Sequence, residues 1–253
     1  MPPVATQAIV LAAMRYGETS KIVRLATRDL GVQSAIAKGA LRPKSRFGAS
    51  LHLLAEGQAT LHLSRSSDLH LLTKFDAARV HTGLAGRMDR FATATVLSEL
   101  MLRFAPASAH PASFELLRDA LALLEAAPAA AVEPLGLRAL WRMVAVLGFT
   151  PALTGCARDG APVDTSRPNA FSARDGGVLC SRCEKGVETA RLRPEDQADL
   201  AAFLDPAAPL PSLDERHLAA HRRLLERYVR HHLGEGAELP ALEFWLSRSW
   251  AAA

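Results

Sequence analysis

The sequence predicts an α+β protein in which a small β-barrel is followed by a mainly α-helical domain that carries a short cysteine-bearing insertion. Three observations lead to this prediction. Short runs of branched apolar residues fill residues 1–80, apolar residues recur at helical spacing beyond them, and all three cysteines fall within residues 149–192. We therefore expect a barrel domain at 1–80 and a helical domain at 81–253, with a degenerate zinc-ribbon-like insertion at 149–192.

Six short apolar runs in the first 75 residues are candidate strands, and turn residues separate each from the next. They are 7–12, 22–27, 32–38, 51–55, 58–64 and 69–75. Five or six strands in so short a segment fit a closed barrel of the oligonucleotide-binding (OB) type. A small sandwich or an SH3-like barrel would give the same pattern.

Apolar residues at helical spacing predict three helices soon after residue 80. Their apolar faces are formed by Leu97, Leu100, Met101 and Phe104; by Leu116, Leu117, Ala120 and Leu124; and by Leu137, Leu140, Trp141, Val144 and Leu147. We expect the prolines at 106, 111, 128 and 134 to separate these helices and Gly148 to end the third. Two more helices are predicted, one over 194–203 and one that begins at Ser212, which forms a capping box with Glu215.

Positive charge is concentrated in the first third of the chain. The whole chain has a formal net charge of +4, whereas residues 1–75 hold ten basic and four acidic side chains, a net charge of +6. This distribution predicts a polyanionic partner for the amino-terminal domain. Charged residues make up 22% of the chain, and no run approaches the roughly 20 apolar residues of a membrane-spanning helix. Because the start also lacks the pattern of a secretory signal, we expect a cytoplasmic protein with no membrane partner.

A basic loop is the first candidate site. Lys38, Arg42, Lys44 and Arg46 fall within nine residues, among which Gly39 and Pro43 interrupt regular structure. Neighbouring candidate strands add four cations of the same sign. The predicted DNA-binding residues are Arg15, Lys21, Arg24, Arg28, Lys38, Arg42, Lys44 and Arg46. The alternative is a solvated basic loop, but the shared charge of the flanking strands favours contact with a phosphate backbone.

Aromatic side chains add little to this interface. The region offers only Tyr16, Phe47 and Phe75, and we expect at least one of them to lie in the core. Single-strand binders commonly stack bases on exposed aromatic rings. With so few rings available, we predict binding that is dominated by electrostatics and has no sequence specificity.

A defective pair of cysteine knuckles is the second candidate site. Cys156 is followed three residues later by Asp159, and Cys180 by Cys183. Two CxxC knuckles would predict a structural zinc ion, and zinc also accepts a carboxylate oxygen. The predicted ligands are therefore Cys156, Asp159, Cys180 and Cys183, with reduced affinity because a soft thiolate has been lost. The alternative is a relic held by packing alone, and we expect substoichiometric or absent zinc after purification without added metal.

No residue pattern predicts catalysis. His217 and His221 lie one helical turn apart, but they lack the glutamate of a metalloprotease motif and are surrounded by arginines. We interpret this helix surface as solvated or phosphate-facing. The sequence also lacks a Walker-type loop, a nucleophile elbow and an acidic nuclease cluster, so we expect a protein that is not an enzyme.

The order of these segments resembles the bacterial DNA repair family RecO over nearly the whole chain. The resemblance is carried by AIVL at 8–11, YGETSKIV at 16–23, TRDLG at 27–31, AKGA at 37–40, Arg42, KS at 44–45, GFTPAL at 148–153, Cys156, FS at 171–172, GGVLC at 176–180 and Cys183. It implies an OB barrel, a helical domain and an inserted zinc-binding or zinc-relic element. Asp159 departs from the four-cysteine form of that element, which puts the metal in doubt but not the fold.

The resemblance also implies a role in homologous recombination and recombinational repair. It implies a factor that binds single- and double-stranded DNA, anneals complementary strands and, with RecR, helps load RecA onto gaps coated by single-strand-binding protein. Its partners would be DNA, RecR, the tail of single-strand-binding protein and, indirectly, RecA, in the cytoplasm at the bacterial nucleoid. One alternative is a protein-interaction scaffold whose helical domain binds repair partners while the barrel is structural. A weaker alternative is a zinc-dependent nucleic-acid enzyme.

Overall fold

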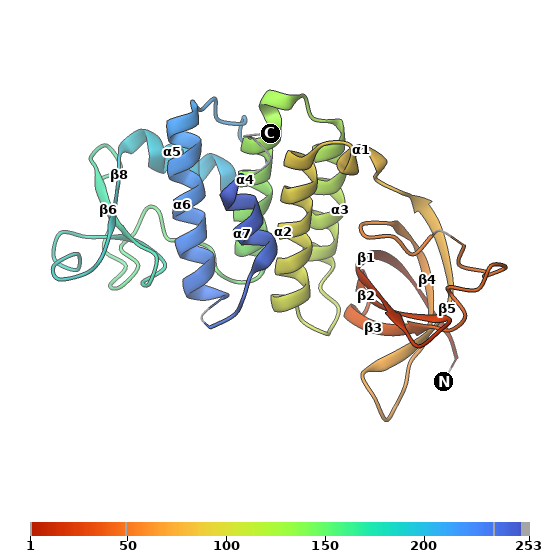
Figure 1. The fold of residues 1–253 in the computed structure, drawn as a ribbon. Coiled ribbons are helices and arrows are strands. Elements are labelled where there is room, and N and C mark those ends of the chain that lie inside the picture. Colours follow the sequence, from red (N-terminus) through yellow and green to blue (C-terminus); the bar gives the residue numbers. More distant parts are fainter. Residues whose placement is uncertain (1, 49, 235, 249–253) are drawn as a thin grey trace. The chain divides into compact units, whose positions relative to one another are not determined.

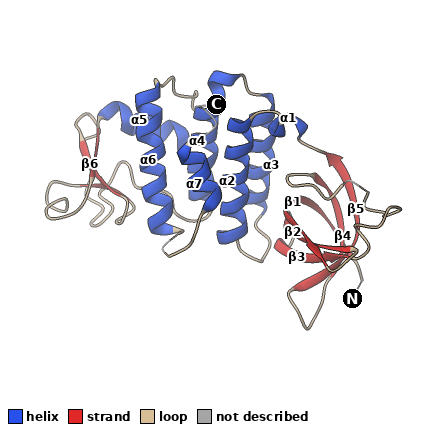
Figure 2. Ribbon diagram, in the orientation of Figure 1, coloured by secondary structure: helices blue, strands red, loops and turns tan. Residues whose placement is uncertain are grey.

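The fold is described from a computed structural model over residues 2–48, 50–234 and 236–248 (Figure 1). Two compact units make up the chain, Met1–Ala126 and Ala127–Ala253. Strands form a barrel in the first unit and a small sheet in the second, and helices make up most of the remainder (Figure 2). This arrangement confirms the predicted α+β class.

A closed barrel of five strands forms the amino-terminal part of the first unit. Its strands are β1 (Val4–Tyr16), β2 (Ser20–Thr27), β3 (Gly31–Ala37), β4 (Glu56–His62) and β5 (Leu69–Arg79), in the order β1-β2-β3-β5-β4. All neighbours are antiparallel except β3 and β5. The predicted OB-type barrel of five or six strands is confirmed, and it has five.

One of the six candidate strands, 51–55, is wrong. This segment is a turn that lies against β1, where Leu54 N donates to Val10 O and Val10 N donates to Ala55 O. Leu51, Leu54 and Ala55 are buried, and Leu54 has a positive φ of 65°. The segment is apolar because it lies over the interior of the barrel and buries its side chains there. Unlike the side chains of a strand, they do not alternate between a buried and an exposed face.

Alternation along the strands fills the barrel. Val23 and Leu25 of β2 point inward to the core, together with Ala8 and Val10 of β1. Between Val10 and Ala12 the register of β1 against β2 shifts by a bulge. Bulges of this kind bend a strand and help a small sheet to close.

Three helices complete the first unit. They are α1 (Thr82–Ala85), α2 (Met88–Phe104) and α3 (Pro111–Ala126), and α2 and α3 lie side by side in Figure 1. The turn between β2 and β3 packs on the loop between α2 and α3, where Val32 N donates to Pro106 O at 3.2 Å. Gly31 lies at this contact with φ of 73°, and a Cβ there would collide with the carbonyl oxygens of Pro106 and Ser108.

The second unit contains four helices and one small sheet among its described residues. Its elements are α4 (Ala129–Val146), β6 (Asn169–Ser172), β7 (Gly177–Leu179), β8 (Ala190–Leu192), α5 (Pro194–Leu204), α6 (Glu215–His232) and α7 (Pro240–Ser247). The sheet has the order β7-β6-β8 and lies within the segment 149–192 that was expected to be the insertion.

Two details of the predicted helices are wrong. Pro134 lies inside α4, where it removes one backbone hydrogen bond near the start of the helix instead of separating two helices. The cap of α6 is Asp214, whose carboxylate accepts a hydrogen bond from His217 N at 2.9 Å, rather than Ser212. Asp214 directly precedes the first helical residue and is an equally good capping residue.

The barrel strands end at Arg79, and α1 to α3 belong to the same compact unit as the barrel. The division into domains 1–80 and 81–253 stays a prediction. Within the described ranges, no helix combines the length and the apolar character that crossing a membrane requires.

Candidate nucleic-acid interface and cysteine cluster

The β1–β2 hairpin brings the first two predicted cations together. Arg15 and Lys21 are directly opposite one another across the two strands. Lys21 shares the inward face of β2 with Val23, but at the end of the strand, where its ammonium donates to Leu51 O at 3.4 Å. Arg15 is exposed beside it. Both cations therefore lie at the hairpin end of the barrel.

The loop after β3 folds back onto the same hairpin. Lys21 is opposite Ala37, the last residue of β3, so the loop starts beside Lys21. Leu41 N donates to Thr19 O at 2.8 Å, and Gly39 N approaches Ser20 Oγ at 3.4 Å. These bonds hold the start of the loop against the turn between β1 and β2.

Buried apolar residues anchor the loop while its cations face solvent. Ala40 and Phe47 are buried in the barrel core. Successive turns connect them and continue past Phe47: Ser45 N donates to Arg42 O, and Gly48 N donates to Ser45 O. The exposed cations of this loop are Lys38, Arg42, Lys44 and Arg46.

These contacts bring six of the eight predicted cations to one end of the barrel. We call Arg15, Lys21, Lys38, Arg42, Lys44 and Arg46 the basic end. Over the described ranges 2–48, 50–234 and 236–248, none of the six forms an ion pair with an acidic side chain. Glu18, in the hairpin turn, is the one acidic residue of the two sequence stretches that supply these cations, 15–21 and 38–46. The basic end therefore presents charge that no acidic side chain of the described residues neutralises.

The other two predicted cations lie elsewhere on β2. Arg24 alternates with the inward-facing Val23 and Leu25, so it lies on the outer face, about 10 Å along the strand from Lys21. Arg28 lies past the opposite end of β2 and donates to Glu115 at 2.9 Å. Glu115 raises the pKa of Arg28, whose charge is therefore already paired.

Only one of the three candidate aromatic residues is exposed. Phe47 and Phe75 are buried in the barrel core, as expected for at least one of the three. Tyr16 is 53% exposed at the tip of the β1–β2 hairpin, next to Arg15. The Arg46 guanidinium lies 5.3 Å from the centre of the Phe47 ring, a cation–π contact that helps to orient it.

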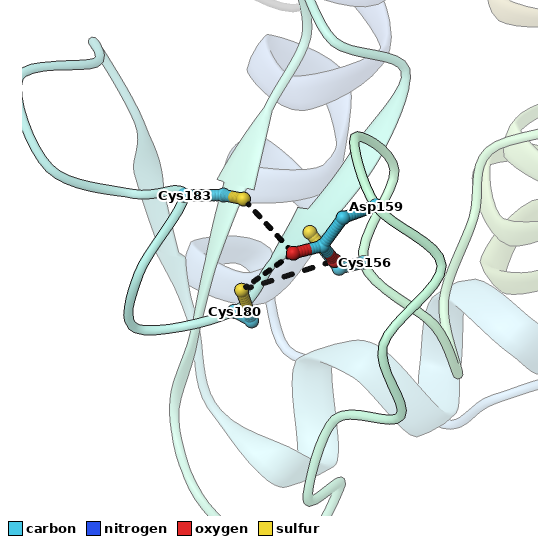
Figure 3. Close-up of side chains that lie close together, drawn as sticks. All are labelled: Cys156, Asp159, Cys180 and Cys183. Atoms are coloured by element: carbon cyan, nitrogen blue, oxygen red, sulfur yellow. Dashed lines mark hydrogen bonds between the residues drawn. The ribbon is translucent and has the colours of Figure 1, made fainter.

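The cysteine cluster lies at one end of the small sheet in the second unit. Cys180 and Cys183 flank the turn that follows β7, and Cys156 and Asp159 flank a facing turn (Figure 3). The Asp159 carboxylate is 3.3 Å from Cys183 Sγ and 3.6 Å from Cys180 Sγ. The structure thus brings together all four predicted ligands.

Arg182 is a contact of this cluster that the sequence analysis missed. Its guanidinium donates to Asp159 at 2.6 Å. This bond, with those from Cys156 and the backbone of Ala161, holds the pKa of Asp159 well below its usual range. The Asp159 carboxylate in turn raises the pKa of Cys183 to about 12. A basic residue between the two cysteines of a CxxC knuckle was the signal available in the sequence.

The donor set fits a zinc ion in its composition and spacing. One donor atom from each of the four residues lies within 4.8 Å of the others. Tetrahedral zinc with bonds of about 2.0–2.3 Å needs donors roughly 3.5–3.8 Å apart. The cluster could therefore hold a metal ion that joins the two facing turns, for which Arg182 is a competing cation at Asp159.

The interpretation of the α6 histidines is wrong for His221. This residue is 2% exposed, packed edge-on against Phe203, and is not part of a solvated surface. His217 keeps partial exposure and contacts Asp214 and Arg193. The neighbouring arginines suggested a polar helix surface, whereas in the structure α6 directs one of the two histidines inward.

Comparison with known proteins agrees with this geometry. A family model described as the recombination protein O N terminal matches residues 1–80, and one described as the recombination protein O C terminal matches residues 86–240. The chain belongs to the RecO family. A DNA repair protein RecO of Anaeromyxobacter sp. (strain K) is 33% identical over 246 residues, covering 92% of this chain and 93% of the relative.

Other relatives carry the same description. A DNA repair protein RecO of Nocardioides sp. is 32% identical, covering 91% of this chain and 94% of the relative. One of Exiguobacterium sp. is 35% identical, covering 71% and 70%. This chain is therefore a DNA repair protein of the RecO family, as the resemblance in its sequence predicted.

Proposed function

We propose that this RecO-family protein binds single- and double-stranded DNA through the basic end of its barrel and acts without catalysis. The observation that carries the proposal is the convergence, on one hairpin and one anchored loop, of six cations that pair with no acidic side chain among the described residues. OB barrels bind oligonucleotides with the face of strands 2 and 3 and with the loop between strands 1 and 2. Arg24, on the outer face of β2, extends the positive surface from the basic end onto the face of β2.

Strand annealing follows from the same electrostatics. Cations that neutralise phosphates reduce the repulsion between two complementary strands, and contacts to phosphate leave the base edges free to pair. With RecR, such a factor helps load RecA onto gaps coated by single-strand-binding protein, in the bacterial cytoplasm at the nucleoid. Arg28 takes no part in our proposal, because Glu115 already pairs with it.

Charge reversal at the basic end tests the proposal. The variant carries Arg42→Glu, Lys44→Glu and Arg46→Glu, and its matched control carries Arg103→Glu, Arg167→Glu and Lys185→Glu, which are also exposed. We expect the first variant to lose affinity for all DNA sequences alike, in fluorescence anisotropy titrations at low salt, and the control to lose much less. Equal losses in the two variants would contradict the proposed interface.

A scaffold role for the second unit is the alternative, and one observation favours it. A cavity of about 570 Å³ lies between the small sheet and α6 and is lined by Arg158, Phe171, Arg174, Leu224 and Arg227. Its mixture of cationic and apolar side chains suits an acidic peptide that also carries apolar residues. We propose it as a surface for RecR or for the tail of single-strand-binding protein.

Purified partners distinguish the two roles. Arg174→Glu combined with Arg227→Glu should abolish pull-down of the partner that uses this cavity while DNA affinity persists. Intact repair function after charge reversal at the basic end would favour the scaffold over the DNA-binding role.

A further inference from the structure

A second cluster of metal-ligand side chains lies between α5 and α6, away from the cysteines. Asp196 and Asp199 are one turn apart on α5, and His221 faces them from α6. One donor atom from each lies within 4.8 Å of the others. His221 Nε2 is 3.9 Å from Asp199 Oδ2, beyond the range of a hydrogen bond.

His221 is held inside this cluster without a hydrogen bond. Its side chain is 2% exposed, and neither ring nitrogen has a hydrogen-bond partner among the residues that the structure describes. The Phe203 ring packs edge-on against the imidazole, with 5.3 Å between the ring centres, and helps to fix its orientation. Buried polar side chains are almost always satisfied, so this exception requires an explanation.

The charges around the cluster leave Asp199 and His221 available to a cation. Arg193 donates to both oxygens of Asp196 but does not pair with Asp199. Burial lowers the pKa of His221 to about 4, so at neutral pH one of its two ring nitrogens carries a free lone pair. Burial, with the nearby Asp196, also raises the pKa of Asp199, as expected for a carboxylate without a strong counter-ion.

A cavity borders the cluster. It has a volume of about 180 Å³ and is lined by Asp196 and His221, so a small ion in it would lie next to two of the three side chains. Arg191, Arg223 and Arg227 also line it, and they oppose the entry of a cation. Asp199, which forms no ion pair with an arginine among the described residues, offsets part of this repulsion where the donors meet.

We propose that Asp196, Asp199 and His221 bind one divalent transition-metal ion that links α5 to α6. Carboxylate oxygen and imidazole nitrogen are donors that suit Mn²⁺, Fe²⁺, Co²⁺ and Zn²⁺. The thiolates of the cysteine cluster are softer donors, so the two sites differ in the ions they select. Three protein ligands leave further coordination positions for water from the cavity.

Mn²⁺ is the probe that separates the two sites, because it prefers oxygen and nitrogen to thiolate. Free Mn²⁺ is followed by electron paramagnetic resonance during titration of the full chain. We expect one Mn²⁺ per chain, at unchanged affinity when Cys180 and Cys183 are replaced by serine. Asp199→Asn should lower the affinity by at least about tenfold.

The matched control is Glu195→Gln, which removes one negative charge from the same helix at an exposed position outside the cluster. It should bind Mn²⁺ like the unaltered chain. Equal affinity in the Asp199→Asn variant and the unaltered chain, or no saturable binding in either, would overturn the proposal. Nuclear magnetic resonance adds a readout that needs no variant: bound Mn²⁺ must broaden the His221 ring signals first, and their persistence overturns the proposal.

Discussion

At the scale of single residues, the surroundings of a charge decide what it can do. Arg28 and Arg46 are both exposed arginines of the amino-terminal third. Arg28 is paired with Glu115, whereas Arg46 lies over Phe47 and forms no ion pair with any acidic side chain that the structure describes. Tyr16 and Phe47 differ in the same way, because the Tyr16 ring is exposed to solvent and the Phe47 ring is buried. The sequence predicted DNA binding for both arginines, but their contacts in the structure support that role only for Arg46.

Tyr228 gives a prediction at the same scale. Its ring packs against Trp141, Phe171 and His232, and burial raises its pKa to about 12. Because the folded state keeps the phenol proton that the unfolded chain loses near pH 10, stability is full below pH 10 and falls as pH rises toward 12. Two pKa units correspond to about 2.7 kcal/mol.

Urea unfolding at a series of pH values, followed by the fluorescence of buried Trp141, measures this loss. In Tyr228→Phe the free energy of unfolding should fall less over the same interval. A variant as sensitive to pH as the unaltered chain would show that another group is responsible.

At the scale of elements, one close contact packs the barrel against the helices of its own unit. The turn between β2 and β3 approaches the loop between α2 and α3 so closely that only glycine fits at residue 31. Gly31→Ala should therefore destabilise the first unit by roughly 2–5 kcal/mol, from a left-handed backbone and a collision with two carbonyls. Gly17→Ala is the matched control, since Gly17 has φ of 58° with nothing within 4 Å of an added Cβ. It should cost about 1–2 kcal/mol.

Hydrogen exchange of the β2 and β3 amides in the full chain measures both effects. This probe is needed because the tryptophans at 141, 245 and 250 all lie beyond the first unit. Similar protection in the two variants would mean that the turn moves aside at little cost.

The cysteine cluster gives the second prediction for an element. Asp159→Cys restores a fourth thiolate and removes the carboxylate that Arg182 now binds. We expect the variant to retain one zinc ion per chain after purification, and the unaltered chain to retain less than one, by elemental analysis. Arg182→Gln tests the competition separately and should raise zinc affinity in the presence of Asp159. A full complement of zinc in the unaltered chain would contradict the expected weakness of the site.

At the scale of the whole molecule, the number of unpaired cations sets the salt dependence of DNA binding. Six phosphate contacts correspond to a slope of log affinity against log salt of roughly −4 for single strands and roughly −5 for duplex DNA. These values are upper limits in magnitude, reached only if each cation of the basic end meets a phosphate. Arg46→Gln should reduce the slope by about 0.7 on single strands, whereas Arg28→Gln should leave it unchanged. An affinity indifferent to salt would exclude the electrostatic interface.

The sequence by itself determined the α+β class, the five barrel strands, the helical remainder, the family and the four residues of the cysteine cluster. Alternating burial, helical periodicity and motif spacing are local properties, so they can be recognised along the chain. Only the tertiary structure decided that segment 51–55 is a turn, that Arg28 is paired, and that His221 is buried facing Asp196 and Asp199. Each of these three features depends on a contact with a residue that is distant in the sequence. Such contacts are determined by the packing of one element on another, which the local sequence pattern of either element does not reveal.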